Sequence, residues 1–275
     1  MLAPDRILVA VAAALFIGIS KAGFGGGLGM LTTPLCVLAF GAKDAIGILL
    51  PLLCAGDLFS LVHYWGKWKV ENLKYLLPGV VLGVVIGIWL IARFANRGSS
   101  RELNLVIGLL AVAFVAFQVF KSAIFRAEGE FEPNHRIGLP FGLGTGITST
   151  FAHGAGPVVS MFLIPQNLSK TLFVGTNVLI FTWVNWIKVP FFCLDQSVLN
   201  VAWLPAESLI NLRTLKTSAL LLPLVPLGVW MGVRLNRRFS ETWFTRFIFL
   251  SLFLAGLQLI FNFDLAGWFG AHRTR

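Results

Sequence analysis

Long apolar stretches with almost no charge are the feature that most limits what this chain can fold into. Residues 72–92 and 103–120 are two of several such windows, each close to 20 residues long. An α-helix rises about 1.5 Å per residue, so about 20 apolar residues cross the roughly 30 Å hydrocarbon core of a bilayer. These windows therefore predict membrane-spanning helices.

The composition argues against an ordinary soluble protein. Of the 275 residues, 57% are hydrophobic and 12% are charged, whereas about a quarter of the residues in a typical soluble domain are charged. The formal net charge of +10 does not predict a nucleic-acid partner, because the basic residues lie between apolar segments, where lipid headgroups and the positive-inside rule place them. We expect an all-α, polytopic integral membrane protein in contact with membrane lipid.

An internal repeat divides the chain. The stretch LLPGVVLGVVIGIWLIARF from Leu76 returns as LLPLVPLGVWMGVRLNRRF from Leu221. Identities fall at one constant offset, among them Pro78 on Pro223, Gly83 on Gly228, Gly87 on Gly232, Arg93 on Arg238 and Phe94 on Phe239. We predict a first transmembrane repeat at 1–120, a polar linker at 121–136 and a second repeat at 137–275, which has an extra segment near 195–212 that forms a short interfacial helix or lid.

Each predicted half begins with short apolar pieces separated by glycines, at 7–20 and 27–40 and again at 137–152 and 154–165. Pieces of this length reach only about 20 Å and cannot cross the bilayer alone. Such pieces at matching places in two repeats indicate the binding site of a transporter, because irregular backbone is tolerated in a membrane only where it is buried or lines a cavity. The alternative is that the glycines only allow close helix packing.

Ionisable residues inside apolar segments are the other pointers to function. When Gly47 is aligned with Gly175, Asp57 falls on Asn185 and Ser60 on Lys188. The Asp57 carboxylate could pair with Lys188 or Lys21, or take up a proton that drives transport. A structural Asp57–Lys188 ion pair without contact to substrate is the alternative.

Lysines, hydroxyls and the N–H groups of a half-helix suit a small oxyanion. The predicted substrate-binding residues are Lys21, Gly25, Gly26, Gly27, Thr32, Ser149, His153, Gly154, Gly156, Asn177, Asn185 and Lys188. Trp183 and Trp186 flank Asn185, and the sequence leaves open whether they line the pathway or pack between helices.

Motifs for nucleotide binding and metal ligation are not found in the sequence, so we expect no cofactor, no metal and no enzymatic activity. A secondary transporter would then run on an ion gradient or on the gradient of its substrate. A passive anion channel with the same lining stays open. The rival class is an intramembrane hydrolase, with Ser149 or Ser160 as nucleophile and His153 as base.

Four motifs resemble the sulfite exporter TauE/SafE family of membrane permeases: GFGGGLGMLTTP, GAKDAIG, AHGAGP and FVGTNVLIFTWVNWIKVP. The resemblance covers roughly residues 15–262. It implies transport of sulfite, a sulfonate or a related organosulfur anion across a bacterial cytoplasmic membrane. It also points to the breaks at 25–29 and 154–157, and to Asn177, Asn185 and Lys188. Lys21 and Asp57 depart from the commonest family pattern, so the resemblance leaves the substrate open.

The relation between the halves depends on the short pieces. If they are re-entrant hairpins, each half crosses the membrane an odd number of times and the repeats are inverted; if they cross in pairs, the repeats could be parallel. Consecutive loops carry similar numbers of basic residues, so the sequence fixes neither the orientation in the membrane nor whether the chain forms a homo-oligomer.

Overall fold

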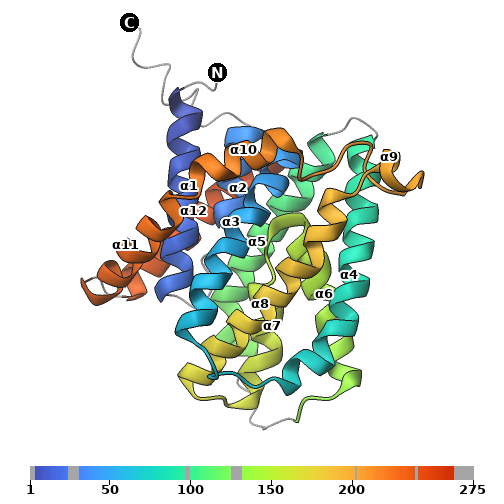
Figure 1. The fold of residues 1–275 in the computed structure, drawn as a ribbon. Helices are drawn as coiled ribbons and strands as arrows, with labels where there is room; N and C mark the ends of the chain where they lie inside the picture. The colour runs from blue at the N-terminus through green and yellow to red at the C-terminus, as the bar shows by residue number, and fades with distance from the viewer. Residues whose placement is uncertain are drawn as a thin grey trace, which may run out of the picture.

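The computed structural model describes residues 4–23, 31–96, 100–124, 132–201, 203–238 and 241–262. All regular elements in these ranges are helices (Figure 1), which confirms the predicted all-α class. The elements are α1 (Pro4–Gly23), α2 (Thr32–Phe40), α3 (Ala42–His63), α4 (Glu71–Asn96), α5 (Ser100–Ile124), α6 (His135–Ala152), α7 (Gly156–Leu163), the 3₁₀ turn η2 (Ile164–Gln166), α8 (Lys170–Cys193), α9 (Gln196–Leu199), α10 (Leu212–Leu221), α11 (Leu224–Arg238) and α12 (Glu241–Phe261).

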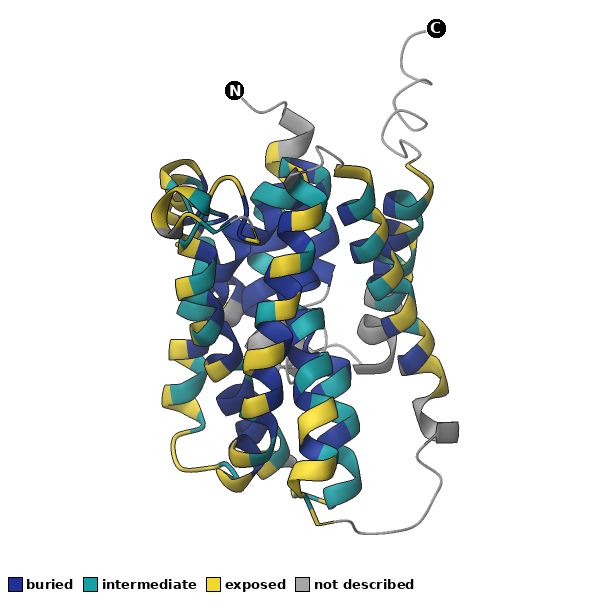
Figure 2. Ribbon diagram, turned by 90° about the vertical axis from the view of Figure 1, so that its right-hand side faces the viewer, coloured by how far each residue is buried: buried dark blue, intermediate teal, exposed yellow. Residues whose placement is uncertain are grey.

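Four helices of the described part are long and apolar enough to cross a membrane. They are Ala42–His63, Glu71–Ala95, Ser100–Phe117 and Thr171–Cys193. Figure 2 shows exposed positions on the outward faces of the helices and buried positions inside the bundle. The exposed positions of α4 include Leu82 and Trp89, side chains that suit contact with lipid. The protein is therefore a multi-pass membrane protein.

The broken segments at the start of each half differ in part from the prediction. The second piece of each pair is short, since α2 has 9 residues and α7 has 8. The first pieces are longer than predicted, with 20 residues in α1 and 18 in α6. In Figure 1, α6 and α7 both reach the lower end of the bundle, whereas α1 begins and α2 ends near the upper end.

The long helices α3 and α8 run in opposite directions, and helices of the two predicted halves pack against each other. In Figure 1, α3 runs from the upper to the lower end of the bundle and α8 runs from the lower to the upper end. α4 packs along α6 and α1 packs along α11, while α5 packs along α12 and α3 against α8. Each of these four pairs joins one helix from 1–120 with one from 137–275.

Glycines of the sequence repeat permit two of these crossings. A Cβ on Gly83 of α4 would overlap the carbonyl oxygen of Leu143 in α6, and a Cβ on Gly228 of α11 would overlap that of Leu15 in α1. Small residues let helix backbones approach closely in a membrane, where apolar side chains alone provide little drive for association. The aligned glycines Gly83 and Gly228 therefore serve the same purpose in the two crossings.

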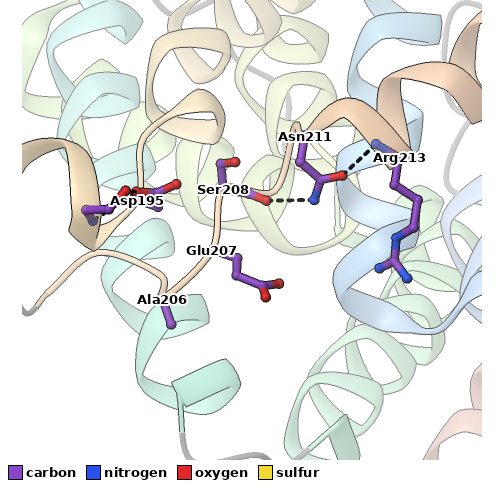
Figure 3. A pocket seen from close by; sticks show the side chains of 7 residues that line it. Asp195, Ala206, Glu207, Ser208, Asn211 and Arg213 are labelled. Carbon is purple, nitrogen blue, oxygen red and sulfur yellow. Dashed lines mark hydrogen bonds between the residues drawn. The ribbon is translucent and has the colours of Figure 1, made fainter.

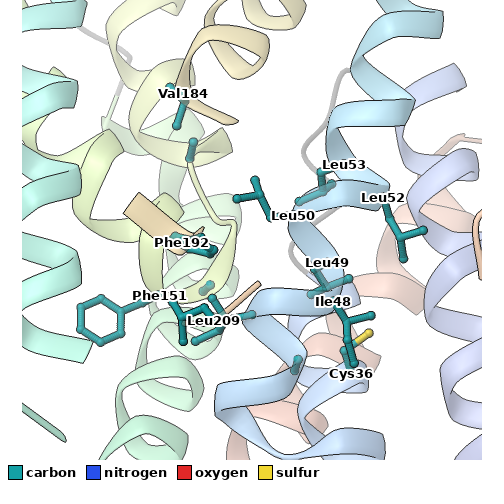
Figure 4. Packing of buried hydrophobic residues seen from close by; sticks show 14 of the residues in the cluster. Cys36, Ile48, Leu49, Leu50, Leu52, Leu53, Phe151, Val184, Phe192 and Leu209 are labelled. Carbon is teal, nitrogen blue, oxygen red and sulfur yellow. The ribbon is translucent and has the colours of Figure 1, made fainter. Parts of the chain in front are cut away.

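One apolar core joins the two halves. Figure 4 shows part of it, including Leu49 and Leu50 of α3, Phe192 of α8 and Leu209 of the segment that follows α9. The stretch predicted as an extra segment contains the four-residue helix α9 and irregular chain leading to α10. Of the predicted linker, residues 121–124 belong to α5 and 135–136 to α6, while 125–131 lie outside the described residues.

Candidate functional site

The chain breaks after α6 in the interior of the bundle. α6 ends at Ala152, and His153 takes the left-handed conformation (φ 48°, ψ 28°) before α7 begins at Gly156. Thr33, in the first turn of α2, donates its hydroxyl hydrogen to the carbonyl oxygen of Ala152 at 2.6 Å. The helix that follows the first break therefore starts against the end of the helix that precedes the second break.

Lys188 binds the end of α6. Its side chain is fully buried, and its Nζ lies 3.1 Å from the Ser149 carbonyl oxygen, 2.9 Å from Ser149 Oγ and 3.0 Å from His153 Nδ1. An ammonium group has three N–H donors, and a buried charge is tolerated only when it is hydrogen-bonded. The last carbonyls of a helix carry partial negative charge, so this is a favourable place for a cation.

His153 links three helices through this contact. Its Nε2 lies 3.1 Å from the carbonyl oxygen of Ile46 in α3. A carbonyl oxygen only accepts, so Nε2 carries the hydrogen and Nδ1 accepts from Lys188; the contacts assign a neutral ring with this tautomer. Phe192, one helical turn beyond Lys188, places its ring centroid 5.9 Å from Lys188 Nζ and 6.3 Å from the His153 ring, which adds a cation–π contact.

A second polar pair lies one turn away along α8. Asn185 Nδ2 donates to Asp57 Oδ2 at 2.6 Å. Only 1% of Asp57 and 5% of Asn185 is exposed. These two residues are equivalent positions when Gly47 is aligned with Gly175, and in the structure they are in direct contact. Asp57 and Lys188 therefore belong to two polar clusters that are neighbours along α8.

The structure brings most of the described candidate residues together. Hydrogen bonds join Ser149, His153 and Lys188, and another joins Asp57 to Asn185. Gly154 lies in the break and donates its N–H to the Thr148 carbonyl oxygen at 3.3 Å. Gly156 and Thr32 are the first residues of α7 and α2, and both are buried.

Other candidates lie elsewhere. Asn177 stands 11 residues before Lys188 on α8, about 16 Å along the helix axis, and its Nδ2 donates to Phe173 of its own helix at 3.2 Å. Trp183 and Trp186 are 48% and 51% exposed, so they face outward and do not line a path through the interior. Gly25, Gly26 and Gly27 lie outside the described residues, as does the side chain of Lys21.

Three residues of this cluster were absent from the predicted set. Thr33 is adjacent in sequence to the predicted Thr32, and Phe192 follows Lys188 by four residues, which is the spacing of neighbours on one helix face. Either could have been inferred from that spacing. Ile46 contributes only a backbone carbonyl, which no side-chain pattern marks.

The described contacts do not pair the Ser149 hydroxyl with His153, the base expected for a hydrolase. For that role, a ring nitrogen of His153 would lie within hydrogen-bonding reach of the hydroxyl. The two ring nitrogens of His153 are instead directed to Lys188 and to Ile46. What the cluster does provide is a buried ammonium group and a hydroxyl at a break between two helices.

A separate polar pocket of about 570 Å³ lies at the upper end of the molecule (Figure 3). Its lining is Asp195, Ser197, Ala206, Glu207, Ser208, Asn211 and Arg213. Lys43 Nζ lies 2.9 Å from Glu207, and Arg213 lies 2.6 Å and 2.7 Å from the two carboxylate oxygens of Asp44. The hydrogen bond from Lys43 and its charge lower the pKa of Glu207, and the Ser197 hydroxyl lowers the pKa of Asp195. The two ion pairs, Lys43 with Glu207 and Arg213 with Asp44, connect the segment after α8 to the start of α3.

Comparison with known proteins agrees with the sequence motifs. The profile of the family described as "Sulfite exporter TauE/SafE" matches residues 10–259, nearly the whole chain. No curated protein and no solved structure matches the chain significantly. With a family match of this extent over a multi-pass helical bundle, the chain belongs to the sulfite exporter TauE/SafE family.

Proposed function

We propose that this protein is a secondary transporter that moves a small anion, namely sulfite, a sulfonate or a related organosulfur compound, across a bacterial cytoplasmic membrane. Membership of a family of sulfite exporters supports the transport class. The observation that carries the anion site is the buried ammonium of Lys188 at the break between α6 and α7. The protein's partners are then the anion and the surrounding lipid.

The charges at the break favour an anion. The end of α6 carries partial negative charge and the start of α7 partial positive charge. Lys188 offsets the first of these through the Ser149 carbonyl, so the ammonium and the start of α7 both favour an anion at the break. An oxyanion presents the same kind of acceptor as the Ser149 oxygens, so it can take over part of the ammonium's hydrogen bonding when it binds.

We further propose that residues 1–120 and 137–275 are inverted repeats. The opposite directions of α3 and α8 (Figure 1) support this. Two helix pairs support it as well: α4 packs against α6, and α11, the counterpart of α4, packs against α1, the counterpart of α6. A contact between two equivalent residues lies near the symmetry axis, and Asp57 with Asn185 is such a contact. Transporters built from inverted repeats bind their substrates near the bilayer midplane at the repeat interface, where this pair and Lys188 would then lie.

The test is anion flux in proteoliposomes. Sulfite, sulfoacetate, sulfate and a plain carboxylate are offered with and without an imposed pH gradient. A carrier accumulates at least one sulfur oxyanion against its gradient. Lys188→Met strongly reduces that uptake, whereas Lys74→Met, which changes an exposed lysine of α4, does not. Downhill flux alone would identify a passive channel, and no flux of any of the four anions would overturn the proposal.

A further inference from the structure

The connections that follow α3 and α8 each cross to the other half of the molecule. Residues 64–70 leave α3 at the lower end of the bundle, whereas the chain from Leu194 to Asn211 leaves α8 at the upper end (Figure 1). Each connection lies against the first turns of the long helix of the other half. The two connections therefore hold opposite ends of the bundle.

The lower contact joins the 64–70 connection to α8. A Cβ on Gly175 would overlap the carbonyl oxygen of Lys67, and Lys69 donates its backbone N–H to Thr176 Oγ1 at 3.0 Å. Thr176 is fully buried. Backbone of the first half thus packs directly on backbone of α8, at a position where only glycine leaves room.

The upper contact joins the segment after α9 to α3 in the same way. A Cβ on Gly47 would overlap the carbonyl oxygen of Leu209. The neighbouring Ile210 donates its N–H to the Phe192 carbonyl oxygen at 2.9 Å, and the ion pair between Lys43 and Glu207 lies beside this contact. The upper contact therefore has an exposed ion pair beside it, for which the described residues of the lower contact show no counterpart.

The two glycines are equivalent positions of the sequence repeat. Gly47 precedes Asp57 by ten residues, as Gly175 precedes Asn185, which is about 15 Å along each helix. Because α3 and α8 run in opposite directions, one glycine lies on either side of the Asp57–Asn185 pair. In this structure both contacts are closed, and Asp57 and Lys188 are buried between them.

We propose that the upper contact at Gly47 and the lower contact at Gly175 are the two gates of the transport path, opened alternately. This inference rests on the proposed transport function. A binding site that opens to one side of the membrane at a time needs a gate toward each side. The two equivalent contacts between a glycine and a carbonyl oxygen can serve as these two gates. Opening either gate requires α3 or α8 to separate from the connection of the other half, as expected when one half rocks against the other.

The gates are tested by labelling a buried cysteine from each side of the membrane. Cys36, Cys54 and Cys193 are replaced by alanine, and Ser149→Cys places one thiol beside Lys188. A membrane-impermeant thiol reagent is then applied to right-side-out and to inside-out vesicles. A variant that destabilises the closed state of a gate by about 1 kcal/mol raises the labelling rate about five-fold.

Gly47→Ala is expected to raise labelling from one side only, and Gly175→Ala from the opposite side only. Milder variants guard against misfolding: Glu207→Gln at the upper contact and Thr176→Val at the lower one should shift labelling in the same directions by smaller factors. The control is Gly144→Ala, whose Cβ meets only the side chain of Val158, at 3.3 Å.

Labelling and flux separate the two proposals. If both glycine variants act on the same side, or if neither they nor the milder variants change labelling while anion uptake persists, the gate assignment is wrong and the transport proposal stands. If labelling responds on opposite sides but none of the four anions is transported, the gates stand and the substrate assignment fails.

Discussion

α3 and α8 occupy corresponding places in the two halves but carry different polar chemistry. α3 has Asp57 and Ser60 one turn apart, where α8 has Asn185 and Lys188. Asp57 meets Asn185 directly, whereas Ser60 donates to Gly56 of its own helix at 2.9 Å and Lys188 reaches across to α6. Among the described residues, a repeated framework thus holds a site whose buried lysine comes from the second half. Equivalent framework positions should therefore respond alike to mutation, and equivalent site positions should not.

The largest difference is expected between Lys188→Met and Ser60→Ala. The first removes the only ammonium described in the cluster and leaves the Ser149 oxygens and His153 without its hydrogen bonds. Hydrogen bonds to charged groups contribute about 1.5–3 kcal/mol, so anion uptake at limiting substrate should fall by roughly 10- to 150-fold. Ser60→Ala breaks only a bond within one turn and should keep uptake within about two-fold. The measurement is the initial rate of anion uptake in proteoliposomes, with protein that elutes as a single peak in detergent. Equal losses of uptake in the two variants would contradict the expected difference between the two positions.

Framework glycines should show the opposite behaviour. Gly83→Ala and Gly228→Ala each force a methyl group against a carbonyl oxygen of the crossing helix, and overpacking of this kind costs typically about 1–3 kcal/mol. We expect both variants to lower the thermal stability in detergent by similar amounts, and Gly144→Ala to lower it less. A large loss in one variant and none in the other would contradict the equivalence of the two crossings.

Asp57→Asn tests whether the acidic member of the pair couples protons. An amide keeps a hydrogen-bonding group of the same size opposite Asn185 but cannot titrate, and exchanging a charge-assisted bond for a neutral one costs about 1 kcal/mol. We expect uptake to persist at a reduced rate and to lose its response to an imposed pH gradient. A full response to the gradient in this variant would leave Asp57 as a positioning partner of Asn185.

The smallest effect is expected at the upper contact, whose Lys43–Glu207 ion pair has no counterpart among the described residues of the lower contact. Lys43 lowers the pKa of Glu207 below its ordinary value of 4.5, so the pair contributes at neutral pH and loses its contribution as the pH falls through that lowered pKa. Acidification or high salt should therefore raise labelling of the Ser149→Cys reporter from the upper side slightly, and less in Glu207→Gln. Asp44, Asp195 and Arg213 remain in the variant as the surrounding charges. The same acid response in both proteins would exclude this ion pair as its cause.

Several features of the fold could be predicted from composition, because only predominantly apolar segments form helices that are stable in the lipid bilayer. The apolar windows 72–92 and 103–120 predicted two of the long helices of the described part, α4 and α5, since backbone polar groups in a bilayer must be satisfied within a helix. The repeat singled out Gly83 and Gly228 before their contacts were known. The lengths of α1 and α6 were underestimated, because charged or glycine-containing turns at their ends continue as helix when neighbouring helices pack against them.

The candidate site was predicted in its residue types and only partly in its pairing. Asp57, Asn185 and Lys188 stood out as polar groups in apolar segments, and the alignment made Asp57 and Asn185 equivalent positions. The contact between these two was not predicted, since the expected partners of Asp57 were Lys188 and Lys21. Asn177 fitted the same pattern, yet its Nδ2 bonds to its own helix. Whether such a residue faces the polar cluster depends on how α8 is rotated about its axis relative to the neighbouring helices. The local sequence pattern does not specify that rotation.

By itself, the sequence determined which segments cross the membrane, where the chain repeats and which few polar groups enter the apolar interior. These follow from local composition, because each uncompensated polar group in lipid is costly. Only the tertiary structure decided that Lys188 binds the end of α6, that His153 joins it to Ile46, and that Gly47 and Gly175 receive carbonyl oxygens from opposite ends of the molecule. Those contacts join residues far apart in the chain, so they depend on how the helices cross.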